Sequence, residues 1–142
     1  MGKINSGRLI LAGLVAGIVS DILGFVVDGV LLAPRWAAGM KLLGRPEFAP
    51  NQWIGFNLLG LVLGIATIWI YAAIRPRFGA GPKTAVYAGV VVWIIGSLAP
   101  NLSFMWLGGL FSRHLTVYTT AGALVEIVVG AVAGAALYKE DA

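Results

Sequence analysis

Cysteine is absent from this chain, and histidine occurs once, at His114. Without cysteine the chain cannot form disulfides, thiolate metal sites or a cysteine nucleophile. A single histidine excludes haem ligation by two histidines of one chain and offers no nucleophile–histidine arrangement. No glycine-rich loop between a strand and a helix indicates a nucleotide site. We therefore expect a protein that is not an enzyme and has no cofactor.

Charged residues are also scarce. They make up 11% of the 142 residues, whereas apolar residues make up 59%. A soluble protein carries roughly a quarter charged residues. The net charge of +4 does not indicate nucleic-acid binding, because the cations lie at the ends of apolar segments, where they meet lipid headgroups. The composition predicts a membrane protein whose main partner is the lipid bilayer.

Four apolar segments account for most of the chain, and each exceeds the roughly 20 residues needed to cross a bilayer. The segments cover residues 9–32, 53–74, 84–107 and 115–138. They predict an all-α, polytopic membrane protein in which residues 1–142 form one domain, a four-transmembrane-helix bundle with short loops. The first segment follows two cations, as in a signal peptide, but it continues past any plausible cleavage site, so we expect an uncleaved first span.

Two connections have informative sequences. In residues 33–52, Trp36, Met40 and Leu43 follow the i, i+4, i+7 spacing of a short amphipathic helix lying at the membrane interface. An ordinary loop anchored by a tryptophan is the alternative. Residues 75–83 read RPRFGAGPK, and their glycines and prolines predict a tight turn between antiparallel spans.

The first span carries two acids on a glycine-rich face. Its small and acidic residues are spaced by four, four, three and four positions, which places them on one side of a helix: Gly13, Gly17, Asp21, Gly24 and Asp28. The opposite side is leucine, isoleucine, valine and phenylalanine. Since small residues let helix backbones approach closely, we expect the glycine face to point into the bundle.

Every other span also carries a polar residue on such a face, namely Asn57, Asn101 and Glu126. At the helical rise per residue, Asp21 and Glu126 would lie about 16 and about 15 Å below the same membrane surface, and the two asparagines about 7–9 Å below it. Pro100 should free a backbone carbonyl and kink the third span. The pattern predicts a column of oxygen-bearing groups that reaches the centre of the bilayer.

Ionisable residues inside a membrane are costly, and so they indicate function by default. Two carboxylates at one depth would share a proton or pair with a cation. We expect Asp21 and Glu126 to bind or transport a proton, a cation or a small ligand that passes Asp28, with Asn57 and Asn101 completing the site. The alternative is a non-catalytic accessory or structural subunit of a larger membrane complex, with the acids as hydrogen bonders between helices.

Asp28 has a structural alternative of its own, because it is near enough to the membrane surface to pair with Arg35 or Arg113. Carboxylate and amide oxygens also suit a hard metal cation, but the spacing does not identify a metal. A membrane-embedded enzyme for a lipid-soluble substrate is a third reading of the sequence, and few catalytic groups support it.

Residues 29–36, GVLLAPRW, are followed by Met40 and by Leu43 and Gly44. This layout resembles a family of small bacterial four-span integral membrane proteins of unassigned function, in which a glycine-rich first span runs into a proline and a tryptophan-bearing segment. The resemblance implies a multi-pass protein of the bacterial inner membrane. It supplies no catalytic residue, and the two acids of the first span depart from it.

Counting lysine and arginine gives an orientation. Six cations lie on the side of the termini (Lys3, Arg8, Arg75, Arg77, Lys83 and Lys139), and four lie on the other side (Arg35, Lys41, Arg45 and Arg113). Because cytoplasmic loops carry the excess of cations, both termini are expected in the cytoplasm. Four glycine-faced helices should leave little room for a cavity within one chain, so we also expect a homo-oligomer or a larger membrane complex.

Overall fold

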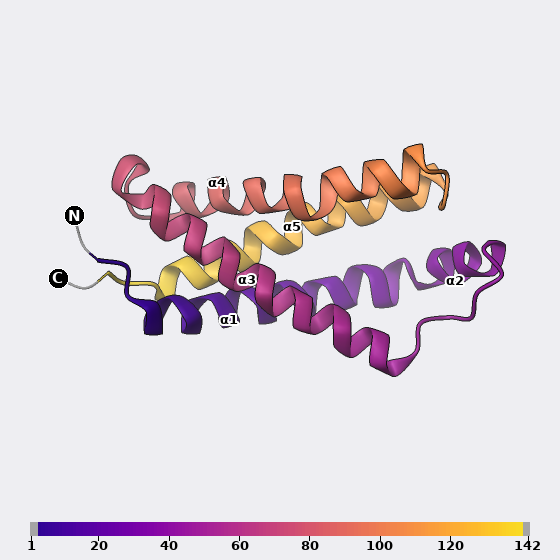
Figure 1. Cartoon of the computed structure of the whole chain (residues 1–142), viewed down its shortest axis with the longest axis horizontal. Helices are drawn as coiled ribbons and strands as arrows, with labels where there is room; N and C mark the ends of the chain where they lie inside the picture. The colour runs from indigo at the N-terminus through magenta and orange to yellow at the C-terminus, as the bar shows by residue number, and fades with distance from the viewer. Residues whose placement is uncertain (1–2, 141–142) are drawn as a thin grey trace.

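The computed structural model describes residues 3–140, which form helices and no strand (Figure 1). The elements in chain order are α1 (Ser6–Gly24), η1 (Phe25–Leu31), α2 (Ala33–Leu42), α3 (Pro50–Phe78), α4 (Pro82–Trp93), η2 (Ile94–Leu98), η3 (Asn101–Leu107) and α5 (Arg113–Leu137). The three η segments are π-helical and continue the α-helices before them.

Four continuous helices are long and apolar enough to cross a membrane: Ser6–Leu31, Pro50–Phe78, Pro82–Leu107 and Arg113–Leu137. The predicted all-α, four-span membrane protein is therefore confirmed. The second helix extends beyond the predicted residues 53–74 at both ends. Pro50 fits the first turn because no N–H is needed there, and the helix includes Pro76 in its last turn.

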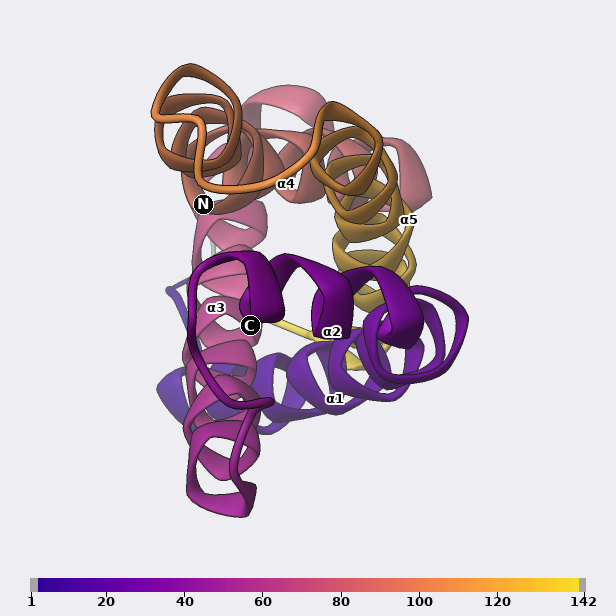
Figure 2. The same cartoon turned by 90° about the vertical axis from the view of Figure 1, so that its right-hand side faces the viewer.

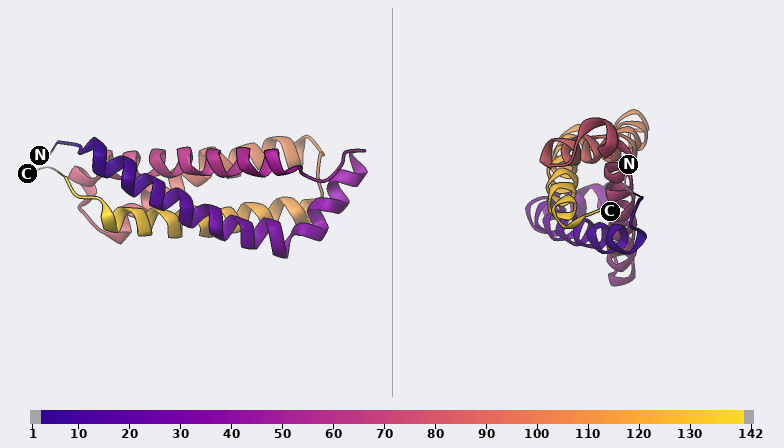
Figure 3. Two further views of the ribbon diagram at one scale, coloured as in Figure 1. Left: turned by 90° about the horizontal axis from the view of Figure 1, so that it is seen from below. Right: turned by 90° about the vertical axis from the view of Figure 1, so that its left-hand side faces the viewer.

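The four spans form a bundle in which α1 packs on both α3 and α5, and α4 packs on α5 and α3. Both ends of the described chain lie at one end of the bundle, and α2 lies at the other (Figures 1 and 3). Seen from that end, α2 crosses the bundle (Figure 2). This arrangement places the 33–49 segment over the space between the helices.

The closest helix contacts involve the glycines that the sequence placed on one face. A Cβ added to Gly64 of α3 would overlap the backbone of Gly13 and Gly17 of α1, and a Cβ on Gly13 would lie 2.5 Å from the Cα of Ile65. On the other side of α1, a Cβ on Gly134 of α5 would lie 2.5 Å from the carbonyl oxygen of Ala12. The prediction that the glycine face of the first span points inward is confirmed.

Both predicted connections have a defined structure. The helical alternative for the 33–52 segment is confirmed by α2, where Met40 is buried and the Trp36 ring centroid lies 5.2 Å from that of Phe111. The tight turn between the second and third spans is also confirmed. Gly79 and Gly81 have φ values of 84° and 129°, which favour glycine over residues with a Cβ.

The third span changes its winding and separates from α3. It is α-helical to Trp93 and π-helical on either side of Pro100. π-Helical turns are rare in α-helices and are frequently found at functional sites. Helix α3 packs against α4 but not closely against η2 or η3, and the two spans diverge toward the α2 end (Figure 1). The kink at Pro100 remains a prediction. The change from α-helical to π-helical winding shows that the backbone is irregular on either side of this proline.

Candidate functional site

A cavity of about 360 Å³ lies between the spans in the half of the bundle nearer α2. Its lining includes all five residues that the sequence singled out for binding: Asp21, Asp28, Asn57, Asn101 and Glu126. Pro100 is outside this lining. The expectation that glycine-faced helices leave little room was wrong, because α3 diverges from the π-helical part of the third span. The structure thus brings the predicted residues together, and their function remains a prediction.

The carboxylates of Asp21 and Glu126 lie at neighbouring positions of α1 and α5. The hydroxyl of Ser20 donates a hydrogen bond to the backbone carbonyl of Glu126 at 3.0 Å, which ties the two helices together at this level. Each carboxylate also lies against a glycine of a neighbouring helix. A Cβ on Gly60 would overlap the Asp21 carboxylate, and a Cβ on Gly24 would lie 3.2 Å from Oε2 of Glu126. These glycines leave the space that the acids occupy.

Glu126 places a buried oxygen atom beside the cavity. Within residues 3–140, its Oε1 atom is buried and has no hydrogen-bond partner. Asp21 and Asp28 line the same cavity, and its described lining contains no lysine, arginine or histidine. Because a buried polar atom without a partner is costly, this oxygen favours uptake of a proton or of a positively charged ligand.

Asp28 lies on η1 and connects three segments. Its Oδ1 atom accepts one hydrogen bond from the indole Nε1 of Trp36 at 3.0 Å and another from the hydroxyl of Thr119 at 2.7 Å. Trp36 belongs to α2 and Thr119 to α5. Asp28 therefore connects the first span with α2 and α5 at the edge of the cavity.

The expected pairing of Asp28 with Arg35 or Arg113 is not present among the described residues, and both arginines lie on aromatic rings instead. The Arg35 guanidinium lies 5.0 Å from the centre of the Tyr118 ring, and that of Arg113 lies 5.3 Å from the Trp106 ring. Arginine stacks readily on aromatic faces. Both cations are thereby directed away from the cavity, which remains acidic.

The two asparagines behave differently. Asn101 donates through Nδ2 to the hydroxyl of Thr120 at 2.9 Å and to that of Ser97 at 3.3 Å, so it bonds between helices. Asn57 is exposed and donates to the carbonyl of Trp53, one turn earlier on its own helix, at 2.8 Å. Both amides donate through Nδ2, and both residues line the cavity.

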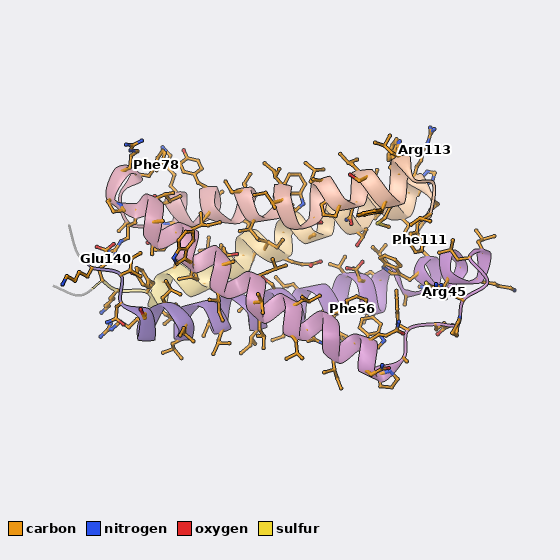
Figure 4. All side chains as sticks on the ribbon, viewed as in Figure 1. Arg45, Phe56, Phe78, Phe111, Arg113 and Glu140 are labelled. Carbon is orange, nitrogen blue, oxygen red and sulfur yellow. The ribbon has the colours of Figure 1, made fainter. Side chains whose placement is uncertain are left out.

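The sequence reading missed the aromatic residues of the cavity. Trp36, Phe48, Trp53 and Phe56 line it at the α2 end, and Figure 4 shows Phe56 on the half of α3 nearer α2. Of these, only Trp36 was given a role, as an interfacial anchor. The sequence does contain a signal for this cluster, because Phe48, Trp53 and Phe56 lie within nine positions of the chain, on both sides of Pro50.

The carboxylates lie at two levels of the cavity: Asp28 lies next to α2, and Asp21 and Glu126 lie together further along the bundle. Among residues 3–140, no group of three or more histidine, cysteine, aspartate or glutamate side chains could hold a metal ion. The described acidic residues of the cavity thus form one pair, Asp21 with Glu126, and one separate carboxylate, Asp28.

Known proteins do not identify this site: no family model, curated protein or solved structure matches the chain. The resemblance to small bacterial four-span proteins is supported by the four membrane-spanning helices and by nothing finer.

Proposed function

We propose that this protein is a small integral membrane protein that binds or transports a proton, a cation or a small ligand through Asp21 and Glu126. One observation supports this most directly: a buried, unpartnered Glu126 oxygen within residues 3–140 shares a cavity with two further carboxylates and no cationic side chain. Like charges at close range in a low dielectric repel strongly, so uptake of positive charge stabilises the site.

The proposed route enters from the α2 end and passes Asp28 before it reaches Asp21 and Glu126. Asn57 and Asn101 offer amide oxygens along the same cavity. Alternating access by rocking of helices is compatible with the loose packing of α3 on η2 and η3. In this proposal the protein has no catalytic residue, and its acids act by binding.

The proposal also covers the cellular location, the membrane orientation and the partners of the protein. The protein would be a multi-pass protein of the bacterial inner membrane with both termini in the cytoplasm, since six of its ten lysines and arginines lie on the side of the termini. Its partners would be the bilayer and either further copies of the chain or a larger membrane complex. Trp69, which is 56% exposed on α3, is a candidate contact for such a partner.

The test is the thermal stability of the detergent-purified protein between about pH 5 and pH 9. Ionising the acids places negative charges together without a cation, so the wild type should lose stability as the pH rises. Asp21→Asn and Glu126→Gln should each flatten that dependence, because each removes one of the interacting charges. Glu140→Gln is the matched control, since Glu140 pairs with Arg75 at the opposite end of the bundle, 3.5 Å apart.

Flat curves that are identical for the wild type and the two cavity variants would contradict the proposal. The acids would then be neutral hydrogen bonders between helices. The accessory-subunit alternative would take precedence, and altering Trp69 should then release a protein partner while the pH response stays unchanged.

A further inference from the structure

Aromatic rings form one side of the cavity at the α2 end. We call Trp36, Phe48, Trp53 and Phe56 the aromatic wall; all four line the cavity. The ring centroid of Phe48 lies 5.8 Å from Trp36, 5.9 Å from Trp53 and 5.4 Å from Phe56, in edge-to-face geometries. The wall is assembled from α2, from α3 and from the connection between them, so it exists only in the folded chain.

The aromatic wall is joined to the acids of the cavity. Trp36 donates its indole N–H to Asp28 at 3.0 Å, and Asp28 lines the same cavity as Asp21 and Glu126. The faces of aromatic rings carry negative electrostatic potential and attract cations, most strongly where water is excluded. The wall and the carboxylates therefore favour the same sign of charge, and the wall also offers a large apolar surface.

The dimensions of the cavity favour an organic occupant. Its volume of about 360 Å³ falls within the range of sites that hold small molecules, about 300–1,000 Å³. A dehydrated metal ion needs several oxygen ligands within about 2.6 Å, and the described acidic residues form no such group. A cation with an apolar body can place its charged group among the carboxylates, and its apolar body can fill the rest of the cavity.

The cavity also borders the lipid. Its lining comes from α3 on one side, including Leu63, and from η2 and η3 on the other, including Gly96. The backbones of these elements do not pack closely on one another, and the boundary between them is formed by the flexible side chain of Leu63, which would lie 3.7 Å from a Cβ on Gly96. Small and apolar residues at this boundary would give a lipid-soluble ligand a second entry, sideways from the bilayer, in addition to the route from the α2 end.

From these observations we infer that the ligand is a lipid-soluble organic cation. Its charged group lies near Asp21, Asp28 and Glu126, and its apolar body lies against the aromatic wall. This inference rests on the proposed function, because it uses the same carboxylates, and it adds the chemical class of the ligand.

The experiment compares benzyltrimethylammonium with neopentylbenzene, its neutral isostere, by isothermal titration calorimetry of the protein in detergent. The cation should bind saturably and the neutral isostere should bind at least about tenfold more weakly. Replacing Phe56 by leucine keeps an apolar side chain but removes the π face, so Phe56→Leu should weaken binding of the cation by about five- to tenfold. Trp53→Phe, which keeps a smaller π face, should weaken it less.

Two controls separate this inference from the proposed function. Trp69→Leu alters an exposed aromatic residue of α3 that does not line the cavity, so it should leave binding unchanged. Titration of wild-type protein with sodium chloride tests an inorganic cation. If sodium or protons act through Asp21 and Glu126 while benzyltrimethylammonium does not bind, the inference is overturned and the proposed function stands.

Two further outcomes would also overturn the inference. If the cation and its neutral isostere bind alike, charge plays no part and the inference is overturned. If neither cation binds and the stability curves do not depend on pH, both the inference and the proposed function fall.

Discussion

At the scale of single residues, glycines in this bundle have two roles. Gly13, Gly17 and Gly64 let α1 and α3 come into backbone contact, whereas Gly24 and Gly60 leave space for carboxylates. The same residue type on the same helix face therefore sets both the tightest packing and the place of the acids. The sequence spacing identified that face, but it could not distinguish the two roles, because they depend on which residue of the neighbouring helix lies opposite.

Replacing Gly64 by alanine should destabilise the protein. The new Cβ would overlap the backbone of Gly13 and Gly17, which cannot move aside as a flexible side chain can. Overpacking costs about 1–3 kcal/mol and should outweigh the gain in helix propensity, about 1 kcal/mol. Thermal unfolding in detergent measures the effect.

The matched control is Gly55→Ala on the same helix, where a Cβ would meet nothing within 4 Å. This variant should be as stable as the wild type or slightly more so, because alanine favours the helix. Equal stability of both variants would contradict the prediction and show that the α1–α3 contact tolerates a Cβ at position 64.

At the scale of elements, α2 closes one end of the bundle with few contacts. Trp36 bonds to Asp28 and packs on Phe111, and Gly39 also lies against Phe111. Figure 4 shows Phe111 facing α2. The periodicity of the segment predicted a helix, whereas its attachment to Asp28 could not be foreseen, since one side chain can reach several partners near the membrane surface.

We predict that Asp28→Ala loosens α2. The substitution removes the carboxylate that accepts hydrogen bonds from Trp36 and Thr119. Each buried donor left without an acceptor lowers the stability of the fold by about 1–3 kcal/mol. Because the chain has no cysteine, a single cysteine can report on this. Met40 is 8% exposed, so a cysteine introduced by Met40→Cys should react slowly with a maleimide. In the double variant that also carries Asp28→Ala, this cysteine should be labelled severalfold faster.

Lys41→Cys, at an exposed position of the same helix, should be labelled at the same rate with and without Asp28→Ala. Unchanged protection of the cysteine at position 40 would show that packing on Phe111 is enough to hold α2, and that Asp28 has no structural role there.

At the scale of the whole molecule, the even number of spans places both ends of the described chain on one side of the bundle. The excess of lysine and arginine on that side predicts a cytoplasmic location for it. Arg45→Cys should then react with a membrane-impermeant maleimide in intact cells, and Lys83→Cys only after permeabilisation. Both positions are exposed in the structure. The reverse pattern would invert the proposed orientation and make the α2 end cytoplasmic.

The sequence alone determined the number of spans, the inward glycine faces and the tight turn within residues 75–83. These features follow from local patterns: apolar length, a period of 3.6 residues, and backbone preferences of glycine and proline. It also selected five polar residues that line one cavity, because helical spacing and depth are properties of each span by itself. For residues 33–52 it left a short helix and a tryptophan-anchored loop open, and the structure decided for the helix.

Only the tertiary structure decided what those residues face. The divergence of α3 from η2 and η3 opens the cavity, the stacking of Arg35 and Arg113 on aromatic rings leaves it acidic, and the connection after α2 assembles the aromatic wall. Each of these depends on the relative placement of segments far apart in the chain and on the choice among competing side-chain partners. Local sequence patterns carry no information on either, because both are set by how the helices pack.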